Sequence, residues 1–247
     1  MKTRTHQTEL GYSILISAYK AEDYIEEALD SILKQDFNKE PFEILIGIDN
    51  CQSTLNKLDK IKDKYKKFLK VFYFSDNRGW AQVRNSLFYN ESKYDKILSF
   101  DADDIMLADH VKSLTTHLSK EHPFVRARFR TYITNTDYCP YGDYGIAGNH
   151  FIAYSDFIES LGAWIDWPIS ADSEFLTRVK NNGFDEMYHC PEDTFLLRVH
   201  KDSLTNKSET RNGSAMRNKY KQELAMLKFI PKKYNTPLVN NLYKRLI

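Results

Sequence analysis

The sequence has few of the residues that build covalently or metal-stabilised folds. It contains three cysteines among 247 residues, Cys51, Cys139 and Cys190, and no two of them form a CxxC pair. This spacing argues against both a disulfide framework and a structural zinc knuckle. So few, widely separated cysteines are typical of a reducing compartment, so we expect a cytoplasmic protein.

Long hydrophobic runs and an excess of one charge are also missing. The first residues, "MKTRTHQTELGYS", lack the apolar segment of a signal peptide, and nowhere do about 20 apolar residues follow one another. Any membrane contact is therefore expected to be peripheral. With 35 basic and 34 acidic residues the net charge is +1, which argues against nucleic acid or another general polyanion as the partner.

Hydrophobic residues are plentiful, at 42% of the chain with 14% aromatics, enough for a substantial core. In the first hundred residues, short apolar segments alternate with stretches of helical periodicity. The apolar segments are 12–19, 42–48, 70–74 and 96–100, and the helical stretches are 21–35, 55–69 and 80–90. This alternation predicts an α/β fold with a mostly parallel central sheet flanked by helices.

The second half of the sequence is less regular. We expect a half-exposed strand at 124–133, a Gly- and Tyr-rich loop at 139–150, a short helix at 172–183 and a strand at 194–199. Residues 206–247 are predicted to form an amphipathic helical tail, interrupted at Pro231 and Pro237. From residue 201 onward there are eleven Lys and Arg against three Asp and Glu, so this tail is basic and the preceding body is mildly acidic.

Polar residues follow the ends of several predicted strands. Asp49, residues 75–79 and residues 101–104 each come directly after an apolar segment, and the carboxyl ends of parallel strands form the ligand-binding edge of such sheets. One Asp there is ordinarily a turn or helix cap. Three carboxylates in "DADD" exceed that need, and two on alternate residues can face a divalent cation that keeps water and phosphate as its other ligands.

Three motifs in order give a resemblance to a known family. "YSILISAYKAEDYIEEALDSILKQDF", "DNRGWAQVRNSLF" and "KILSFDADD" resemble the opening strand and helix, the "N-x-G…A-R-N" segment and the "DxD" strand end of the inverting family 2 glycosyltransferases with the GT-A fold. The likeness extends more weakly to "LLRVHKDSLT" and covers about residues 12–205. It implies a catalytic domain at 1–205, with a nucleotide-sugar-binding half at 12–108 and an acceptor-binding half at 109–205.

The resemblance implies transfer of a sugar from a nucleotide-sugar donor, with UDP-sugars favoured, to an acceptor hydroxyl with inversion. Mn²⁺ or Mg²⁺ would bridge the donor's diphosphate. Asp103 and Asp101 are the expected ligands, with Asp104 in support and His200 completing the site. A divalent cation at that place stabilises the negative charge that grows on the leaving diphosphate.

The same resemblance assigns a set of donor-binding residues. They are Ser17, Ala18, Tyr19, Asp49, Arg84, Asn85, Asp101 and Ala102. Tyr19 would stack on the base, or belong to the core. Asp49 would accept from a uracil N–H, or serve as an ordinary turn carboxylate. Arg84 would meet a carboxylate or phosphate through paired hydrogen bonds, or pair with a neighbouring acid on the helix surface.

Inversion needs one general base to deprotonate the acceptor, and two Asp residues compete for that role. Asp172 opens a predicted helix but lacks the Glu that precedes the family's base, whereas Glu192–Asp193 is an intact pair. The place of His200 and Ser203 in the motif order favours Asp172 and makes Glu192–Asp193 a turn before a strand. Trp164, Asp166 and Trp167 are candidate acceptor contacts, with core packing as the alternative for the tryptophans.

Other functions stay open at this point. The chain could be a non-catalytic sugar- or nucleotide-binding protein that keeps the fold, or a nucleotidyltransferase, although the Gly-rich phosphate loop of the latter is missing. Expected partners are a nucleotide sugar and a saccharide, lipid-linked or protein acceptor. The basic tail is expected to pack on the acidic body, or to lie on an anionic membrane surface.

Overall fold

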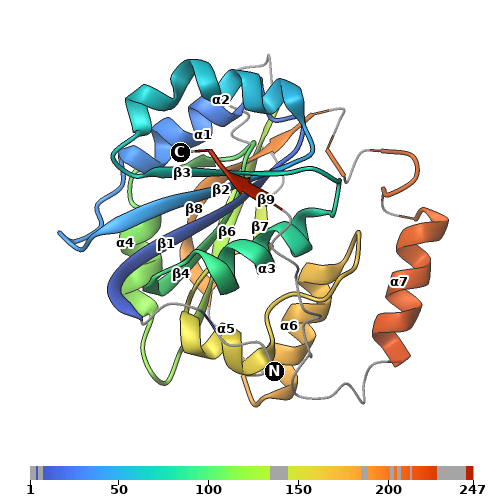
Figure 1. Cartoon of the computed structure of the whole chain (residues 1–247). Helices are drawn as coiled ribbons and strands as arrows, with labels where there is room; N and C mark the ends of the chain where they lie inside the picture. The colour runs from blue at the N-terminus through green and yellow to red at the C-terminus, as the bar shows by residue number, and fades with distance from the viewer. Residues whose placement is uncertain are drawn as a thin grey trace.

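The computed structural model describes residues 4, 8–133, 144–184, 189–200, 203–204, 207–211, 213–226 and 243–246. Pro231, Pro237, Thr205 and residues 139–143 of the expected loop at 139–150 lie outside these residues. In the first half, strands and helices alternate as predicted (Figure 1). The elements are β1 (Glu9–Ala18), α1 (Ile25–Leu33), β2 (Phe42–Asp49), α2 (Gln52–Tyr65), β3 (Leu69–Phe74), α3 (Trp80–Asn90) and β4 (Tyr94–Asp101).

The second half adds a mixed set of elements to the same sheet. They are β5 (Ile105–Met106), α4 (His110–His117), β6 (Phe124–Ile133), β7 (Tyr144–Tyr154), α5 (Ser155–Leu161), α6 (Ala171–Asn181), β8 (His189–Val199), α7 (Ala215–Met226) and β9 (Tyr243–Arg245). β7 begins inside the segment that the sequence predicted to be a loop. β8 begins before Glu192 and Asp193, so the prediction of a turn for these two residues was wrong.

The described strands form one sheet in the order β5-β8-β6-β7-β4-β1-β2-β3-β9. β4, β1, β2 and β3 are parallel, as are β6 and β8, whereas the remaining four pairings are antiparallel. The sheet is therefore a parallel half joined to a largely antiparallel extension, and "mostly parallel" holds only for the first half. β1, β2 and β4 are buried along most of their length, as expected for strands covered on both faces.

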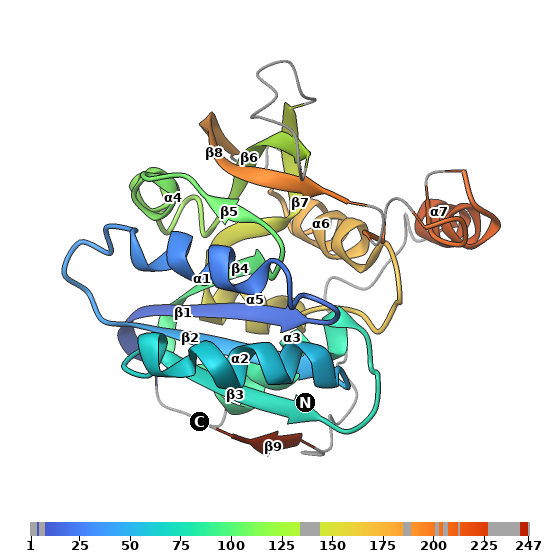
Figure 2. The same cartoon turned by 90° about the horizontal axis from the view of Figure 1, so that it is seen from above.

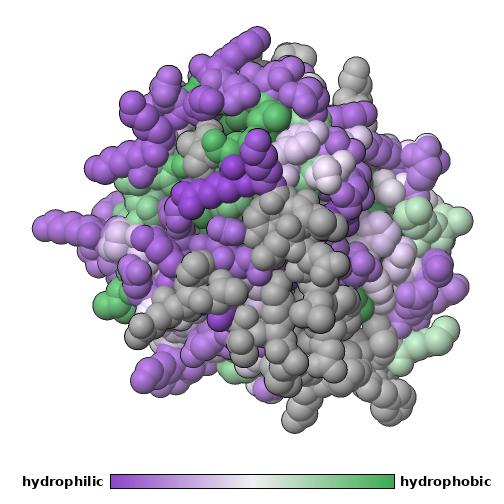
Figure 3. Space-filling model, viewed as in Figure 1, coloured by the Kyte–Doolittle hydropathy of each residue, from purple (hydrophilic) through white to green (hydrophobic). Residues whose placement is uncertain are grey.

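Helices cover the two faces of the sheet and define two cores. α1, α2 and α4 contribute to one cluster of buried apolar residues, and α3, α5 and α6 contribute to the other. Figure 1 shows α1 and α2 above β1 and β2 and α3 below them, and in Figure 2, seen from above, α1 and α2 lie in front of the strands. The lysines of α2 lie on its outer side, which is part of the hydrophilic rim at the top of Figure 3. None of the described helices is long and apolar enough to cross a bilayer.

The C-terminal part departs from the predicted helical tail. α7 buries none of its residues and stands apart from the sheet in Figure 1. β9 pairs antiparallel with β3, with Lys244 opposite Tyr73. A short strand therefore ends the described chain, and it extends the main sheet where the sequence predicted helix.

Candidate active site

The polar residues at the strand ends do converge on one edge of the sheet. In the register of β1, Ser17 lies opposite Gly47 of β2 and Asp101 of β4. Two non-glycine residues adopt the left-handed region there, Lys20 after β1 with φ 53° and Asn50 after β2 with φ 49°. Such backbone costs free energy and is concentrated at functional sites. The polar residues that follow these strands therefore meet at one edge of the sheet, as predicted, and the backbone after β1 and β2 is strained there.

An open pocket of about 420 Å³ lies at this edge. It is lined by Tyr19, Lys20, Glu22, Asp23, Tyr24, Asn50, Cys51 and Ser53. Tyr19 is 46% exposed, so it belongs to the pocket wall and the core alternative for it was wrong. Ser17 is half-buried beside Asp101, whereas Ala18 is fully buried beneath the pocket. Ala18 therefore has no face for a ligand, and its assignment to donor binding was wrong.

Asp49 supports the site without entering the pocket. Its two carboxylate oxygens accept the backbone N–H groups of Arg78 at 2.7 Å and Gly79 at 2.9 Å, and it is 4% exposed. Burial raises the pKa of this carboxyl, although the two backbone bonds act against the rise. The pocket is lined instead by the next residues, Asn50 and Cys51. Of the two roles that the sequence allowed for Asp49, the structure supports the turn carboxylate, because Asp49 holds the loop that leads into α3.

Arg84 and Asn85 of α3 are buried supports. Arg84 is fully buried, donates to Asp101 and to the Phe100 carbonyl at 2.7 Å, and lies over the Trp80 ring. Asn85 brackets the backbone of Trp164, donating to its carbonyl at 2.7 Å and accepting its N–H at 3.0 Å. Neither side chain is exposed to a donor. Of the two roles expected of Arg84, the structure shows the ion pair with a nearby acid, which is buried against Asp101 and does not lie on the helix surface.

The first carboxylate of "DADD" is held in its charged form. Asp101 receives hydrogen bonds from Arg84 and from Asn149 at 3.0 Å. Burial would raise its pKa, but the positive charges of Arg84 and His150 outweigh that effect, so the pKa of Asp101 lies below its ordinary value. The side chain stays 33% exposed. Asp101 can therefore meet a ligand as an anion, while Ala102 is buried beside it.

The last carboxylate of the motif points inward. Asp104 is 1% exposed, accepts the backbone N–H of Arg198 at 2.8 Å and lies 2.9 Å from His150 Nε2. Burial raises the pKa of Asp104 to about 6. Asp101, Asp104 and His150 place their ligand atoms within 4.8 Å of one another. Because His150 is also only 2% exposed, the donor's phosphates would have no open approach from the Asp104 side.

Asp103 faces the other way and meets His200. Its Oδ2 lies 2.9 Å from His200 Nε2, and its side chain is 32% exposed. The His200 ring also packs on Tyr24 at 4.7 Å between centroids, and Tyr24 lines the open pocket. The structure thus brings together the predicted Asp103 and His200, next to the pocket. A carboxylate and an imidazole suit Mn²⁺, with room for phosphate oxygens.

Arg198 joins the end of β8 to the carboxylate turn. Its Nε donates to the Asp103 carbonyl at 2.7 Å, and its Nη2 donates to Glu27 of α1. Its guanidinium also lies over the Tyr24 ring. These contacts explain how a strand almost a hundred residues away in sequence presents His200 to Asp103.

Sequence reasoning missed Asn149 and His150. Both lie in β7, which pairs with β4 so that Ser99 is opposite Phe151. They fall in "GIAGNHFIAY", whose first half was taken as loop. The signal that could have identified them is a pair of polar residues directly before an apolar segment. In the parallel strands of this edge, the polar residues instead follow the apolar segment.

Asp172 lies across β7 from the cluster of Asp101, Asp104 and His150. It is in the first turn of α6, whose N-cap is Ser170 with φ 62°, so Asp172 is not itself the cap. The contact with Gly148 is close: a Cβ atom on that glycine would lie 2.4 Å from Asp172 Oδ2. Burial raises the pKa of Asp172, and the negative charge of Asp101 adds to the rise.

The competing carboxylate is engaged elsewhere. Asp193 of β8 lies 2.5 Å from Arg130 Nε and 3.5 Å from Arg128 Nε, and its side chain is 12% exposed. Its carboxylate is therefore engaged in ion pairs with two guanidinium groups of β6.

The predicted acceptor residues have three different environments. Trp164 is fully buried and stacks on Phe151 and Phe175, so its assignment to the acceptor was wrong and the core alternative holds. Asp166 is exposed, and Trp167 is half-buried against the Tyr220 ring of α7 at 4.9 Å. Only the last two have a face available to a ligand.

This architecture is that of a GT-A fold. The structure resembles Staphylococcus aureus TarS 1-349 in complex with UDP-GlcNAc, with a TM-score of 0.60 and 18% identity over 78% of this chain and 60% of that one. It also resembles the mannosyltransferase PcManGT from Pyrobaculum calidifontis in complex with GDP-Man and Mn²⁺, with a TM-score of 0.63 and 14% identity over 85% and 64% of the two chains.

The sequence comparison defines the family. Residues 13–180, more than half of the chain, match Glycosyl transferase family 2, and the chain belongs to this family. It is 28% identical over 115 residues to the poly(ribitol-phosphate) beta-N-acetylglucosaminyltransferase TarS of Staphylococcus aureus. That match covers 46% of this chain and 20% of the relative, so the chain spans only a fraction of the length of this curated relative.

Proposed function

We propose that this protein is a metal-dependent inverting glycosyltransferase that moves a sugar from a UDP-sugar to an acceptor hydroxyl, with Asp172 as the general base. One observation carries the proposal. Two consecutive residues of β7 contact two different carboxylates: Asn149 donates a hydrogen bond to Asp101, and Gly148 packs against Asp172. The pKa of Asp101 is lowered and that of Asp172 is raised, a separation that is characteristic of acid–base sites.

The residues at the pocket suit a divalent cation. Asp103 and His200 would hold it from the exposed side, Asp101 would contribute its partly exposed carboxylate, and positions would remain for phosphate oxygens and water. When bound, Mn²⁺ or Mg²⁺ would act as a Lewis acid that stabilises charge on the departing diphosphate.

The chain's own residues would prepare the acceptor for attack. Asp172 would take the proton of the acceptor hydroxyl. The hydroxyl oxygen would bond to the anomeric carbon at the same time, as the nucleoside diphosphate departs. A raised pKa favours this role, since an ordinary aspartate is a weaker base. Arg84 and Asn149 would keep Asp101 ionised and in place for the donor.

Uridine donors are favoured by two lines of support. The TarS structures are described in complex with UDP and with UDP-GlcNAc, and PcManGT with GDP-Man shows that related folds take other bases. In this chain, Tyr19 offers an exposed ring and Asn50 an amide at the pocket. A stacking surface and an amide are the groups that would recognise a pyrimidine base.

A thermal-shift screen of nucleotide sugars with and without Mn²⁺ tests the proposal. Ligands that bind only the folded state raise stability by about 2.7 kcal/mol at a hundred times Kd. We expect one UDP-sugar to raise the melting temperature only when Mn²⁺ is present, and to be hydrolysed slowly to UDP in that mixture. Binding without any hydrolysis would instead identify a sugar-nucleotide-binding protein, and no shift with any nucleotide would contradict the proposal.

A further inference from the structure

Strand β6 presents three arginines on one face of the sheet. Alternate residues of a strand point the same way, and Phe124 of β6 packs against Phe175 of α6 at 5.9 Å between centroids. Arg126, Arg128 and Arg130 therefore lie on the side of the sheet that α6 covers. Asp172 opens α6 and contacts Gly148 on the neighbouring strand, so the arginines and the proposed base share this face.

Arg126 differs from the other two arginines in its partners. Asp193 pairs with both Arg128 and Arg130. Arg126 donates to the backbone carbonyls of Ala147 at 2.8 Å and Ile146 at 3.3 Å. Burial lowers its pKa, and the negative charge of Asp172 acts against that lowering. A half-buried guanidinium whose hydrogen bonds go to neutral acceptors gains from an added anion.

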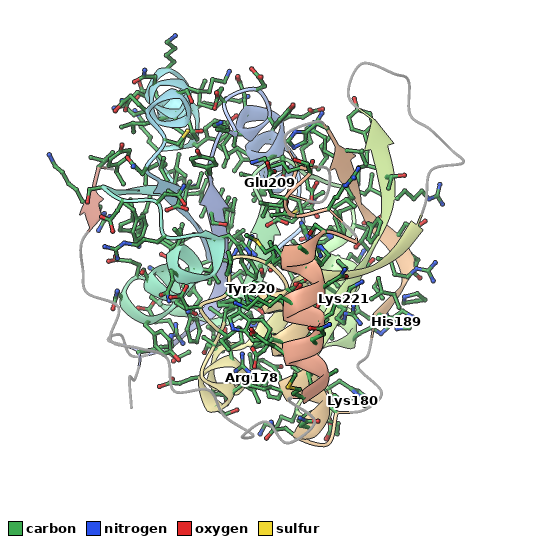
Figure 4. The ribbon with its side chains drawn as sticks, turned by 90° about the vertical axis from the view of Figure 1, so that its right-hand side faces the viewer. Arg178, Lys180, His189, Glu209, Tyr220 and Lys221 are labelled. Carbon is green, nitrogen blue, oxygen red and sulfur yellow. The ribbon has the colours of Figure 1, made fainter. Side chains whose placement is uncertain are left out.

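Helix α7, in the foreground of Figure 4, carries a further cation. The ring contact between Tyr220 and Trp167 holds α7 beside the loop before α6. Arg217 lies one turn earlier, donates from Nε to the Thr210 carbonyl at 2.8 Å, and its charge acts on Asp172. Lys221, four residues on, lies on the same side of the helix. Within the described ranges, no carboxylate lies within ion-pair distance of Arg126 or Arg217.

We propose that Arg126 and Arg217, with Arg128 and Arg130 alongside, form a basic face that binds a phosphate or carboxylate group of the acceptor and presents the acceptor's hydroxyl to Asp172. The planar guanidinium matches both oxyanions through paired hydrogen bonds. The near-neutral net charge does not oppose this, because the charge that matters is local. The inference rests on the proposed function, and it assigns the acceptor a chemical class: a sugar or polyol chain bearing acidic groups.

Fluorescence anisotropy tests the inference with defined chains. The probes are fluorescein-labelled oligomers of ribitol phosphate, of galacturonate and of a neutral glucan, all of the same length. The full protein is first saturated with UDP and Mg²⁺, so that the donor site is filled. We expect at least one acidic oligomer to bind, and the neutral one not to bind. Arg217→Ala should weaken that binding about tenfold, as expected for loss of a hydrogen bond between charged groups.

Two further variants distinguish binding at this basic face from general electrostatic attraction. Lys219→Ala removes the same charge from another position of α7, where the lysine side chain is 69% exposed and 3.8 Å from Glu223, and should leave affinity nearly unchanged. Arg126→Lys keeps the charge but loses the paired geometry, and should weaken binding. Equal binding of the three oligomers, or equal losses for Arg217→Ala and Lys219→Ala, would overturn the inference. Either result would leave UDP binding and donor hydrolysis intact, so failure of the acceptor face is distinguishable from failure of the proposed function.

Discussion

Gly148→Ala should disable the proposed base with little effect on the fold. The new Cβ would lie 2.4 Å from Asp172 Oδ2 and 3.2 Å from its Cγ, whereas ordinary contact begins at 3.4 Å. The carboxylate must therefore move by about 1 Å, and a misplacement of that size costs about 100-fold in rate. Because the obstructing atoms are the end of one side chain, we expect the free energy of unfolding to change by less than about 1 kcal/mol.

The assay compares turnover with donor binding. UDP release gives kcat, titration calorimetry with Mn²⁺ gives the Kd of UDP, and urea unfolding gives stability. Gly145→Ala is the matched control on the same strand, since its Cβ would meet only the Phe129 ring at 3.1 Å. The reasoning fails if Gly148→Ala keeps a kcat close to that of the wild type, or if its UDP affinity falls as much as its kcat.

Four further outcomes are expected. Asp172→Asn should lower kcat by about 10²–10⁴-fold, the usual contribution of a general base, with UDP affinity retained in calorimetry. Since the base works when deprotonated and burial raises the pKa of Asp172, the wild-type rate should fall with decreasing pH through a midpoint above the ordinary aspartate value; a midpoint at or below that value would speak against burial. Asp193→Asn should leave kcat nearly unchanged, and a large loss there would move the base to β8. Arg178→Met should cost about 3–5 kcal/mol in urea unfolding, because it leaves the fully buried Glu174 without its guanidinium; a cost below about 1 kcal/mol would contradict a buried, mutually dependent pair.

The parallel half of the fold could be predicted because its signals are local. Continuous apolar segments followed by amphipathic stretches identify strands covered on both faces. β7 and β9 could not be found in this way. The partner of β7 is β4, some fifty residues earlier, and β9 is a three-residue strand with no periodicity of its own.

Site residues could be predicted where the residue type and its position in the motif are enough to identify the contact. Asp103 and His200 do meet, as the motif order implied. The sequence could not decide between two roles for Asp49 and for Arg84, because it does not show where hydrogen bonds go: Asp49 accepts from backbone N–H groups and Arg84 donates to Asp101. Trp164 failed for a related reason, since a large aromatic residue beside a site is equally suited to the core.

Calorimetric titration of UDP into the wild-type protein and into Asp103→Ala, with and without Mn²⁺, tests the central claim most directly. The account predicts that the wild type binds UDP tightly only when Mn²⁺ is present, and that Asp103→Ala loses this metal-dependent gain. Equal UDP affinity in all four titrations would contradict a metal site at Asp103, and with it the proposed chemistry.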